Sequence, residues 1–199
     1  QGFIPPNMTL GVCGTGLPWC GWFGFNAGSA LGDNAQAVQA LMNTFLAAAA
    51  AGLAWAIVER IRDGHFTNLG AVSGIVAGLV AITPACGFVT SGASILIGLA
   101  AGIVCSFAVR LKFKAGYDDA LDVVGVHFVG GLVGSLMIGL FADAEHFRAW
   151  NPAVSHMDGL FYGGGLRLLA EQALANGVTI LYSGAVTALI LVALKATVG

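Results

Sequence analysis

Residues 67–109 read TNLGAVSGIVAGLVAITPACGFVTSGASILIGLAAGIVCSFAV and contain no Asp, Glu, Lys or Arg. A helix that crosses the hydrocarbon core of a membrane needs about 20 apolar residues. These 43 positions therefore accommodate two membrane-spanning helices, with the break between them at 84–91. The apolar runs are continuous rather than alternating, which favours helices over the strands of a membrane barrel.

The rest of the chain has the same character. Of its 199 residues, 57% are hydrophobic and 9% are charged, whereas a soluble domain has about 25% charged residues. This composition predicts an all-α fold, a polytopic membrane helical bundle with six transmembrane helices. We expect these helices at approximately 9–31, 36–58, 69–86, 92–109, 120–142 and 174–198.

The basic residues predict the orientation of the bundle. With six spans, six of the eight Lys and Arg residues fall on one side of the membrane, and that side should be cytoplasmic. Both ends of this segment are then cytoplasmic, and the connection 143–172 lies outside. The formal net charge of −2 offers no basic field for nucleic acid. The six basic residues are Arg60, Arg62, Arg110, Lys112, Lys114 and Lys195.

Glycines recur at helical spacing within the predicted spans. Gly70, Gly74 and Gly78 follow one another every four residues, which places them along one helix face. Small residues on such a face let a neighbouring backbone approach closely. We therefore interpret these glycines as packing residues rather than as ligand contacts. The same spacing joins Gly98 with Gly102, and Gly130 with Gly134.

The sequence does not indicate an enzyme. It shows no nucleophile beside a base, no phosphate-binding loop and no metal-binding cluster, so neither catalysis nor a cofactor nor a metal is predicted. A haem with two histidine ligands would need two histidines inside the spans, and only one is found there. The four cysteines lack C-x-x-C spacing, which argues against a disulfide framework or a zinc site. They are Cys13, Cys20, Cys86 and Cys105.

His127 is the one histidine predicted to lie well inside a span. An ionisable side chain at that depth is a candidate functional group, although a neutral histidine that hydrogen-bonds across helices is the structural alternative. Val123, four residues earlier, would share its face of an α-helix. A neutral imidazole donates from one nitrogen and accepts at the other, so His127 could guide a small polar solute through a narrow apolar passage.

The segment GWFGFNAGSA, residues 21–30, ends the first predicted span. Trp22, Phe25 and Ser29 share one helix face. Such an aromatic stripe often serves packing alone. Here, however, Ser29 offers a hydroxyl acceptor near the outer interface, and the π face of Phe25 attracts cations. The group suits a small cation held, partly dehydrated, at a pore entrance.

These motifs together resemble those of a known family. GWFGFNAGSA, LGAVSGIVAGLVAITPACGFV (residues 69–89) and DDALDVVGVHFVGG (residues 118–131) are similar to signatures of the ammonium transporter family, the Amt/Mep/Rh group. The resemblance extends over essentially the whole chain. Because that family has eleven spans, these six resemble its sixth to eleventh. Residues 1–199 are therefore expected to form a single membrane domain that is a fragment of a longer ammonium transporter domain.

The resemblance implies a transport mechanism and a role for each site residue. Ammonium is recruited at an outer aromatic and serine site and deprotonated, and ammonia is conducted through an apolar pore past histidine. A neutral molecule crosses such a pore more easily than a bare cation. Ser29 and Phe25 are the implied recruitment site and gate. The implied pore-lining residues are Trp22, His127, Val123, Val76 and Thr83.

The resemblance also implies partners and leaves alternatives. A homotrimer in the plasma membrane is expected, and a PII signalling protein is expected to bind the cytoplasmic face near 60–65 and 110–117. There are two alternative functions. One is an ammonium sensor of the same fold that is coupled to signalling, and the other is an Rh-type neutral gas channel.

Three features depart from the family pattern. The first five spans, with the partner histidine and the second gating Phe, are absent from this sequence. Pro18 stands where a bulky apolar wall residue is usual, and Phe128 where a smaller residue is common. Both substitutions bear on the width of the pore.

Overall fold

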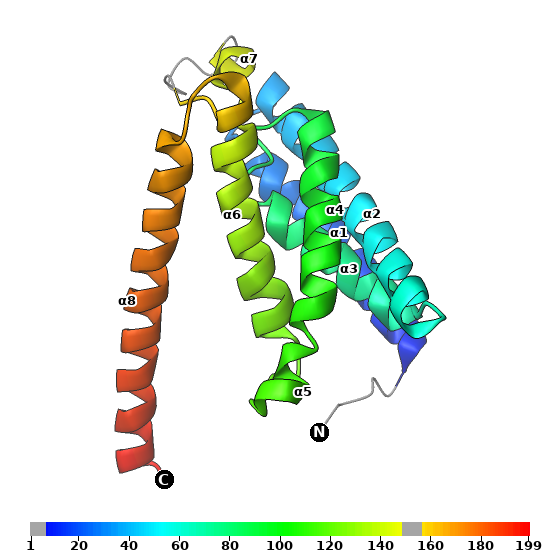
Figure 1. Ribbon diagram of the computed structural model, residues 1–199, viewed down its shortest axis with the longest axis vertical. Coiled ribbons are helices and arrows are strands. Elements are labelled where there is room, and N and C mark those ends of the chain that lie inside the picture. Colours follow the sequence, from blue (N-terminus) through cyan, green and yellow to red (C-terminus); the bar gives the residue numbers. More distant parts are fainter. Residues whose placement is uncertain (1–6, 149–156) are drawn as a thin grey trace.

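The computed structural model describes residues 7–148 and 157–199, and their fold is all-helical, as predicted. Figure 1 shows the long helices running side by side, with the start of α1 and the end of α8 near the same end of the molecule as α5. Within the described ranges, β pairing is limited to an isolated bridge between Val89 and Ala142. The helices are α1 Met8–Gly28, α2 Ala35–Asp63, α3 Asn68–Ile82, α4 Ser91–Ala108, α5 Leu111–Ala115, the π-helix η1 Val123–Phe128, α6 Val129–Phe141, α7 Ala144–Arg148, the 3-10 helix η2 Leu160–Tyr162 and α8 Arg167–Thr197.

Each of the six predicted spans contains a helix, namely α1, α2, α3, α4, η1 with α6, and α8. By length and composition, four helical segments of the described chain could cross a membrane. α3 has 15 residues, and α1, with 21 residues, is less apolar. Both pack within the bundle, because α1 contacts α2 and α3, and α3 contacts α2 and α4. The four segments are Ala35–Asp63, Ser91–Ala115, Val123–Phe141 and Arg167–Thr197.

Local signals in the sequence set the helix boundaries. The Asn34 side chain accepts the Ala37 N–H at 3.0 Å and caps the start of α2, and Gly64, with φ of 80°, ends it. α3 ends at Ile82 rather than at the predicted residue 86, because Pro84 cannot donate a helical hydrogen bond. α8 starts at Arg167, seven residues before its predicted start.

α2 lies between α3 and α4 and forms the centre of the bundle with them. Ala47 and Ala51 on α2 are fully buried. A Cβ atom on Gly78 would lie 2.7 Å from the Ala51 Cβ, and one on Gly98 would lie 2.8 Å from the Ala47 Cα. Since no side chain fits at these glycines, the prediction that they serve close packing is supported by the geometry. Gly130, whose Cβ would make ordinary 3.5 Å contacts, is less constrained.

A buried amide joins α2 to the connection between α3 and α4. The Asn43 Nδ2 donates to the carbonyl oxygens of Cys86 at 2.8 Å and Val89 at 2.7 Å. These carbonyls belong to the predicted break, where the backbone leaves the helix and needs other partners. Asn43 thus replaces the helical hydrogen bonds that the break removes.

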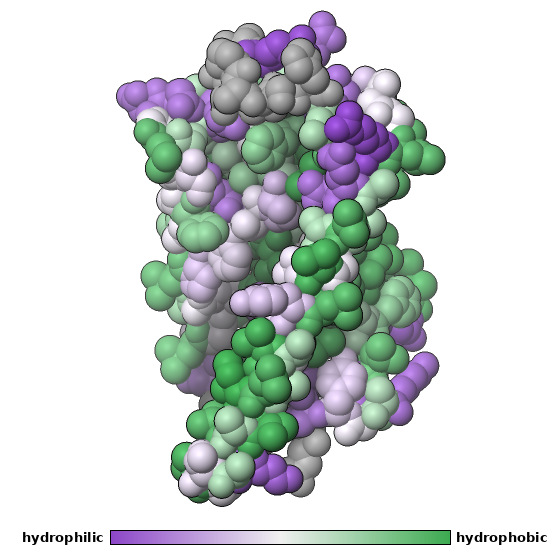
Figure 2. All heavy atoms as spheres, turned by 90° about the vertical axis from the view of Figure 1, so that its left-hand side faces the viewer, coloured by the Kyte–Doolittle hydropathy of each residue, from purple (hydrophilic) through white to green (hydrophobic). Residues whose placement is uncertain are grey.

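α8 differs from the other long helices in its surroundings. It stands beside α6 and apart from the rest of the bundle (Figure 1), and Leu168 is its buried residue. The Ser135 Oγ of α6 donates to the Gln172 Oε1 at 2.8 Å. Figure 2 shows the face on α8's side of the molecule, with hydrophobic side chains dominating its lower half and strongly polar ones gathered near its top.

Candidate functional site

The predicted recruitment residues, Phe25 and Ser29, lie at the end of α1 that is remote from α5. Phe25 is 65% exposed, and Ser29 follows it at the helix end. The Ser29 Oγ donates to the Phe25 carbonyl oxygen at 2.8 Å. Because the hydroxyl proton is used within the helix, the lone pairs of the oxygen face outward as acceptors. This arrangement can accept a hydrogen bond from a cation beside the Phe25 ring.

A hydrogen bond connects two of the predicted pore-lining residues. The Trp22 Nε1 donates to the Thr83 Oγ1 at 2.7 Å, and that hydroxyl donates in turn to the Leu79 carbonyl oxygen at 2.7 Å. Trp22 and Thr83 are half-buried. The contact fixes the face of α1 that carries Phe25 and Ser29 against the end of α3.

A small hollow lies beside Ser29. Its volume is about 120 Å³, and Thr83 is also in its wall. Asn26 was not singled out from the sequence, yet it is buried and its Nδ2 donates to the Thr44 Oγ1 at 2.9 Å. The sequence contains one signal for Asn26, because it is a polar residue directly after Phe25 in an otherwise apolar span. The hollow is lined by Asn26, Ser29, Ala30, Gln36, Ala40, Thr83, Cys86, Gly87 and Phe88.

A second hollow, of about 140 Å³, contains His127 and lies toward the α5 end. Val76 of α3 is in its wall. Val123 is exposed and is not among the residues around this hollow. The walls are completed by residues from α1, α3 and η1, and the full set is Thr15, Val72, Ser73, Val76, Leu121, Asp122, Val126 and His127.

His127 lies on a π-helix, which the sequence analysis did not predict. The predicted helix 120–142 begins at Val123, and its first six residues form η1. In a π-helix the hydrogen bonds run from residue i to i+5, so Val123 does not stand one full turn before His127 as the α-helical interpretation required. π-helical turns occur frequently at functional sites.

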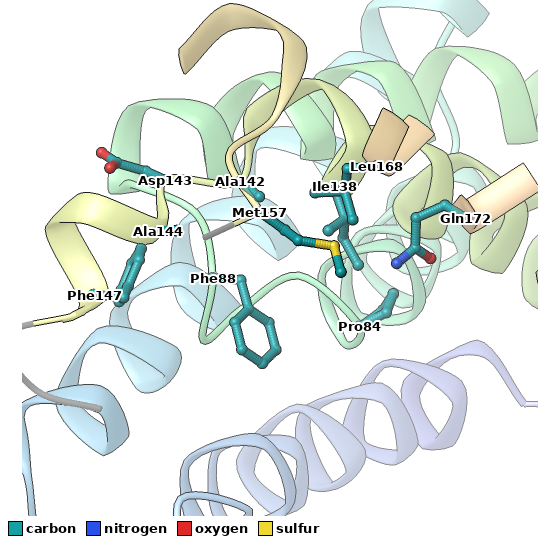
Figure 3. A pocket seen from close by; sticks show the side chains of 10 residues that line it. All are labelled: Pro84, Phe88, Ile138, Ala142, Asp143, Ala144, Phe147, Met157, Leu168 and Gln172. Carbon is teal, nitrogen blue, oxygen red and sulfur yellow. The ribbon is translucent and has the colours of Figure 1, made fainter. Parts of the chain in front are cut away.

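A third hollow lies outside the predicted path. It has a volume of about 380 Å³, and Figure 3 shows Met157, Ile138 and Phe88 around it. None of the predicted site residues is in its wall. Phe88 also lines the hollow beside Ser29. The lining residues are Pro84, Phe88, Ile138, Ala142, Asp143, Ala144, Phe147, Met157, Leu168 and Gln172.

Metal-binding groups are not found in the described part of the chain. No set of three His, Cys, Asp or Glu side chains there could hold a metal ion. Cys86 and Cys105 are buried, whereas Cys13 and Cys20 are exposed on α1, and none of the four forms a disulfide. The buried Cys86 and Cys105 therefore serve as small packing residues inside the bundle.

Charged residues at the α5 end bring two predicted contact segments together. Asp63 pairs with Arg62 at 2.8 Å and with Arg110 at 3.1 Å. The 29 residues of α2 exceed the ~20 needed to cross the hydrocarbon core, so Asp63 lies beyond the membrane-spanning part of α2. The hydrogen bond from Arg62 is the main cause that lowers the pKa of Asp63 below its ordinary value of 3.8. The ion pairs join 60–65 to 110–117.

Comparison with known proteins agrees with the motifs. Residues 1–199 match the sequence model of the Ammonium Transporter Family. An "Ammonium transporter" of Mycobacterium tuberculosis (strain ATCC 25618 / H37Rv) is 50% identical over 197 residues, which are 99% of this chain and 41% of that protein. The chain therefore spans about two fifths of the length of this relative.

Solved structures show the same fold. The crystal structure of Saccharomyces cerevisiae Mep2 aligns with a TM-score of 0.90 and 36% sequence identity, over 96% of this chain and 44% of Mep2. A structure described as "Sensor Amt Protein" aligns with a TM-score of 0.85 and 30% identity, over 96% of this chain and 45% of that one. In both alignments this chain corresponds to less than half of the length of the solved protein.

Proposed function

The chain belongs to the ammonium transporter family, and from this membership we propose that the longer protein containing it transports ammonium across the plasma membrane. One observation supports this most strongly. The hollow beside Ser29 lies between the end of α1, α2 and the residues that follow α3, and the hollow beside His127 lies between α1, α3 and the start of η1. The Trp22–Thr83 hydrogen bond joins α1 to the end of α3. The proposed site residues thus follow one seam of the bundle.

Ser29 and Phe25 form the proposed recruitment site and gate. Ammonium donates a hydrogen bond to the Ser29 oxygen, whose own proton goes to the Phe25 carbonyl, while the Phe25 ring offers its negative face to the cation. Neither group carries a charge. The site therefore holds ammonium weakly enough to release it, which conduction requires.

Below this site ammonium loses a proton and ammonia crosses the seam. Moving a bare cation through an apolar passage is costly, whereas a small neutral molecule passes at much lower cost. Potassium ions cannot lose their charge in this way, so they are excluded. Trp22, Thr83 and Val76 form the proposed wall, and His127 donates to or accepts from ammonia within it. Val123, which the resemblance also implies as a wall residue, is exposed and lies outside the hollow that contains His127.

The proposed assembly extends beyond these 199 residues. Residues 1–199 form a single membrane domain within a longer transporter domain, with both ends of the segment cytoplasmic, and three copies form a homotrimer. A PII signalling protein binds the cytoplasmic face. The proposed PII contact is supported by the Asp63–Arg110 ion pair, because it joins the two predicted contact segments into one surface.

Uptake of labelled methylammonium by the full-length protein, in cells that lack other ammonium transporters, tests the proposal. We expect uptake to fall at least tenfold in His127→Ala and several-fold in Ser29→Ala. Ser183→Ala, on the exposed face of α8, is the matched control for Ser29→Ala and should transport normally. Unchanged uptake in both site variants would show that the assigned roles are wrong.

A sensor that binds ammonium and signals is the second candidate, supported by the structural similarity to the "Sensor Amt Protein". The same recruitment site would serve both functions. Purified full-length protein in liposomes separates them, because a transporter mediates methylammonium flux. A sensor binds methylammonium saturably and mediates none.

A further inference from the structure

Two carboxylates flank the start of η1 and have different partners. The buried Asp119 accepts the N–H groups of Val123 at 2.7 Å and Val124 at 2.9 Å. Its charge is therefore compensated by the helix start. Asp122 adopts a left-handed conformation with φ of 55°, which a residue with a side chain adopts at a cost. It also forms part of the wall of the hollow that contains His127.

The side chain of Lys112 reaches Asp122 from α5. Its Nζ donates to the Asp122 Oδ1 at 2.5 Å and to the Asp119 carbonyl oxygen at 2.8 Å. The Lys112 side chain is 14% exposed and that of Asp122 is 31% exposed. Salt screens such a sheltered pair less than a surface pair. The contact neutralises the carboxylate in the wall of the hollow and connects α5 to the start of η1.

Without Lys112 the same carboxylate would attract cations. Carboxylates at the mouth of a narrow apolar passage concentrate cations there. A cation bound at this mouth would block the exit of a neutral molecule from the passage. The Lys112 ammonium group already occupies the Asp122 Oδ1 and the Asp119 carbonyl oxygen, two acceptors that a monovalent cation would use. Lys112 is therefore positioned to prevent a cation from binding at the Asp122 carboxylate, which would otherwise attract one.

We propose that Lys112, by pairing with Asp122, keeps the α5-side mouth of the His127 hollow electrically neutral and free of bound cations. This role rests on the proposed transport function, and Lys112 acts through Asp122 rather than by contacting ammonia. It is a positioning and specificity-determining residue. Loss of the lysine alone should create a site for a monovalent cation at Asp122.

Binding of Cs⁺ to the purified full-length protein tests this role without requiring transport. Calorimetric titration should show Cs⁺ binding at least tenfold tighter in Lys112→Gln than in the wild type. The double variant Lys112→Gln/Asp122→Asn should return to within twofold of the wild-type affinity. Lys112→Arg retains the charge and should behave like the wild type, as should Lys114→Gln, in which an exposed lysine of the same helix is replaced.

Two results would overturn the proposal. One is an unchanged Cs⁺ affinity in Lys112→Gln, and the other is tighter binding that persists when Asp122 is also replaced. If Lys112→Gln does not fold, Lys112→Met keeps the apolar stem of the side chain and carries the same expectations.

A transport measurement separates this inference from the proposed function. In proteoliposomes, Cs⁺ on the α5 side should inhibit methylammonium flux at least fivefold more strongly in Lys112→Gln than in the wild type, and equal inhibition counts against the role of Lys112. A wild-type protein with no methylammonium flux would refute the transport function, while the Cs⁺ titration would still decide whether Lys112 neutralises the mouth.

Discussion

α2 and α8 are nearly equal in length, with 29 and 31 residues, and both are apolar enough to cross a membrane. Nevertheless α2 is packed between two helices, whereas no part of the most apolar stretch of α8 is buried in the described structure. The two helices differ in what their faces meet. α2 turns small residues such as Ala47 and Ala51 toward glycines, while α8 exposes large side chains such as Leu181 and Leu191.

This contrast separates two kinds of information in the sequence. Hydropathy indicates that a helix can lie in a membrane, because lipid tails and protein interiors are similarly apolar. Residue size indicates which face meets another helix, because only small residues let two backbones approach closely. The apolar surface of α8 is therefore suited to surroundings other than this bundle, either lipid or the remainder of the longer protein.

The largest expected effect comes from a side chain placed on a central glycine. Gly98→Val would place its Cβ 2.8 Å from the Ala47 Cα, and overpacking of this kind costs about 3 kcal/mol when the backbone must move. Gly184→Val on α8, where a Cβ meets nothing within 4 Å, should change the free energy of unfolding by less than about 0.5 kcal/mol.

Reversible unfolding of the full-length protein in mixed micelles measures both glycine variants. Equal effects in the two variants would remove the distinction between α2 and α8 that the packing implies.

A smaller effect is expected from two asparagines. Asn43→Leu leaves the carbonyl oxygens of Cys86 and Val89 without this buried donor, which should cost about 2 kcal/mol. Asn176 on α8 has a buried Nδ2 with no hydrogen-bond partner among the described residues. Asn176→Leu should therefore be neutral or stabilising in the same unfolding assay. A destabilisation of Asn176→Leu as large as that of Asn43→Leu would contradict this account.

The smallest effect isolates one hydrogen bond along the proposed path. Thr83→Val removes the acceptor of the Trp22 N–H and should cost about 1 kcal/mol. Thr179 on α8 makes the same bond to its own helix, from its hydroxyl to the Ala175 carbonyl at 2.8 Å, but has no Trp partner. Thr179→Val should therefore cost at least about 0.5 kcal/mol less, and equal costs would assign the effect to the helix bond alone.

The sequence predicted those parts of the fold that local chemistry determines. The 43 uncharged positions at 67–109 are sufficient to indicate α3 and α4, because burying charges in lipid is costly. Pro84 ends α3 because proline cannot donate a helical hydrogen bond, which is evident from the sequence alone. The glycine spacing identified the packed faces because residues four positions apart lie on one face of any α-helix.

Long-range contacts set the parts that the sequence did not predict. The hollow beside Ser29 depends on Trp22 meeting Thr83, which lies 61 positions away, and residue spacing does not contain that pairing. The π-helix at His127 depends on the Asp119 caps and on Gly125, where a Cβ would lie 2.8 Å from the Val109 Cα. The six residues of η1 carry no pattern in the sequence that distinguishes a π-helix from an α-helix.

An experimental structure of the full-length protein in a lipid bilayer tests the central claim most directly. The account predicts a continuous tunnel that starts beside Ser29, passes Trp22 and Val76 and is faced by the imidazole of His127. A structure in which packed side chains separate His127 from the hollow beside Ser29 would contradict it.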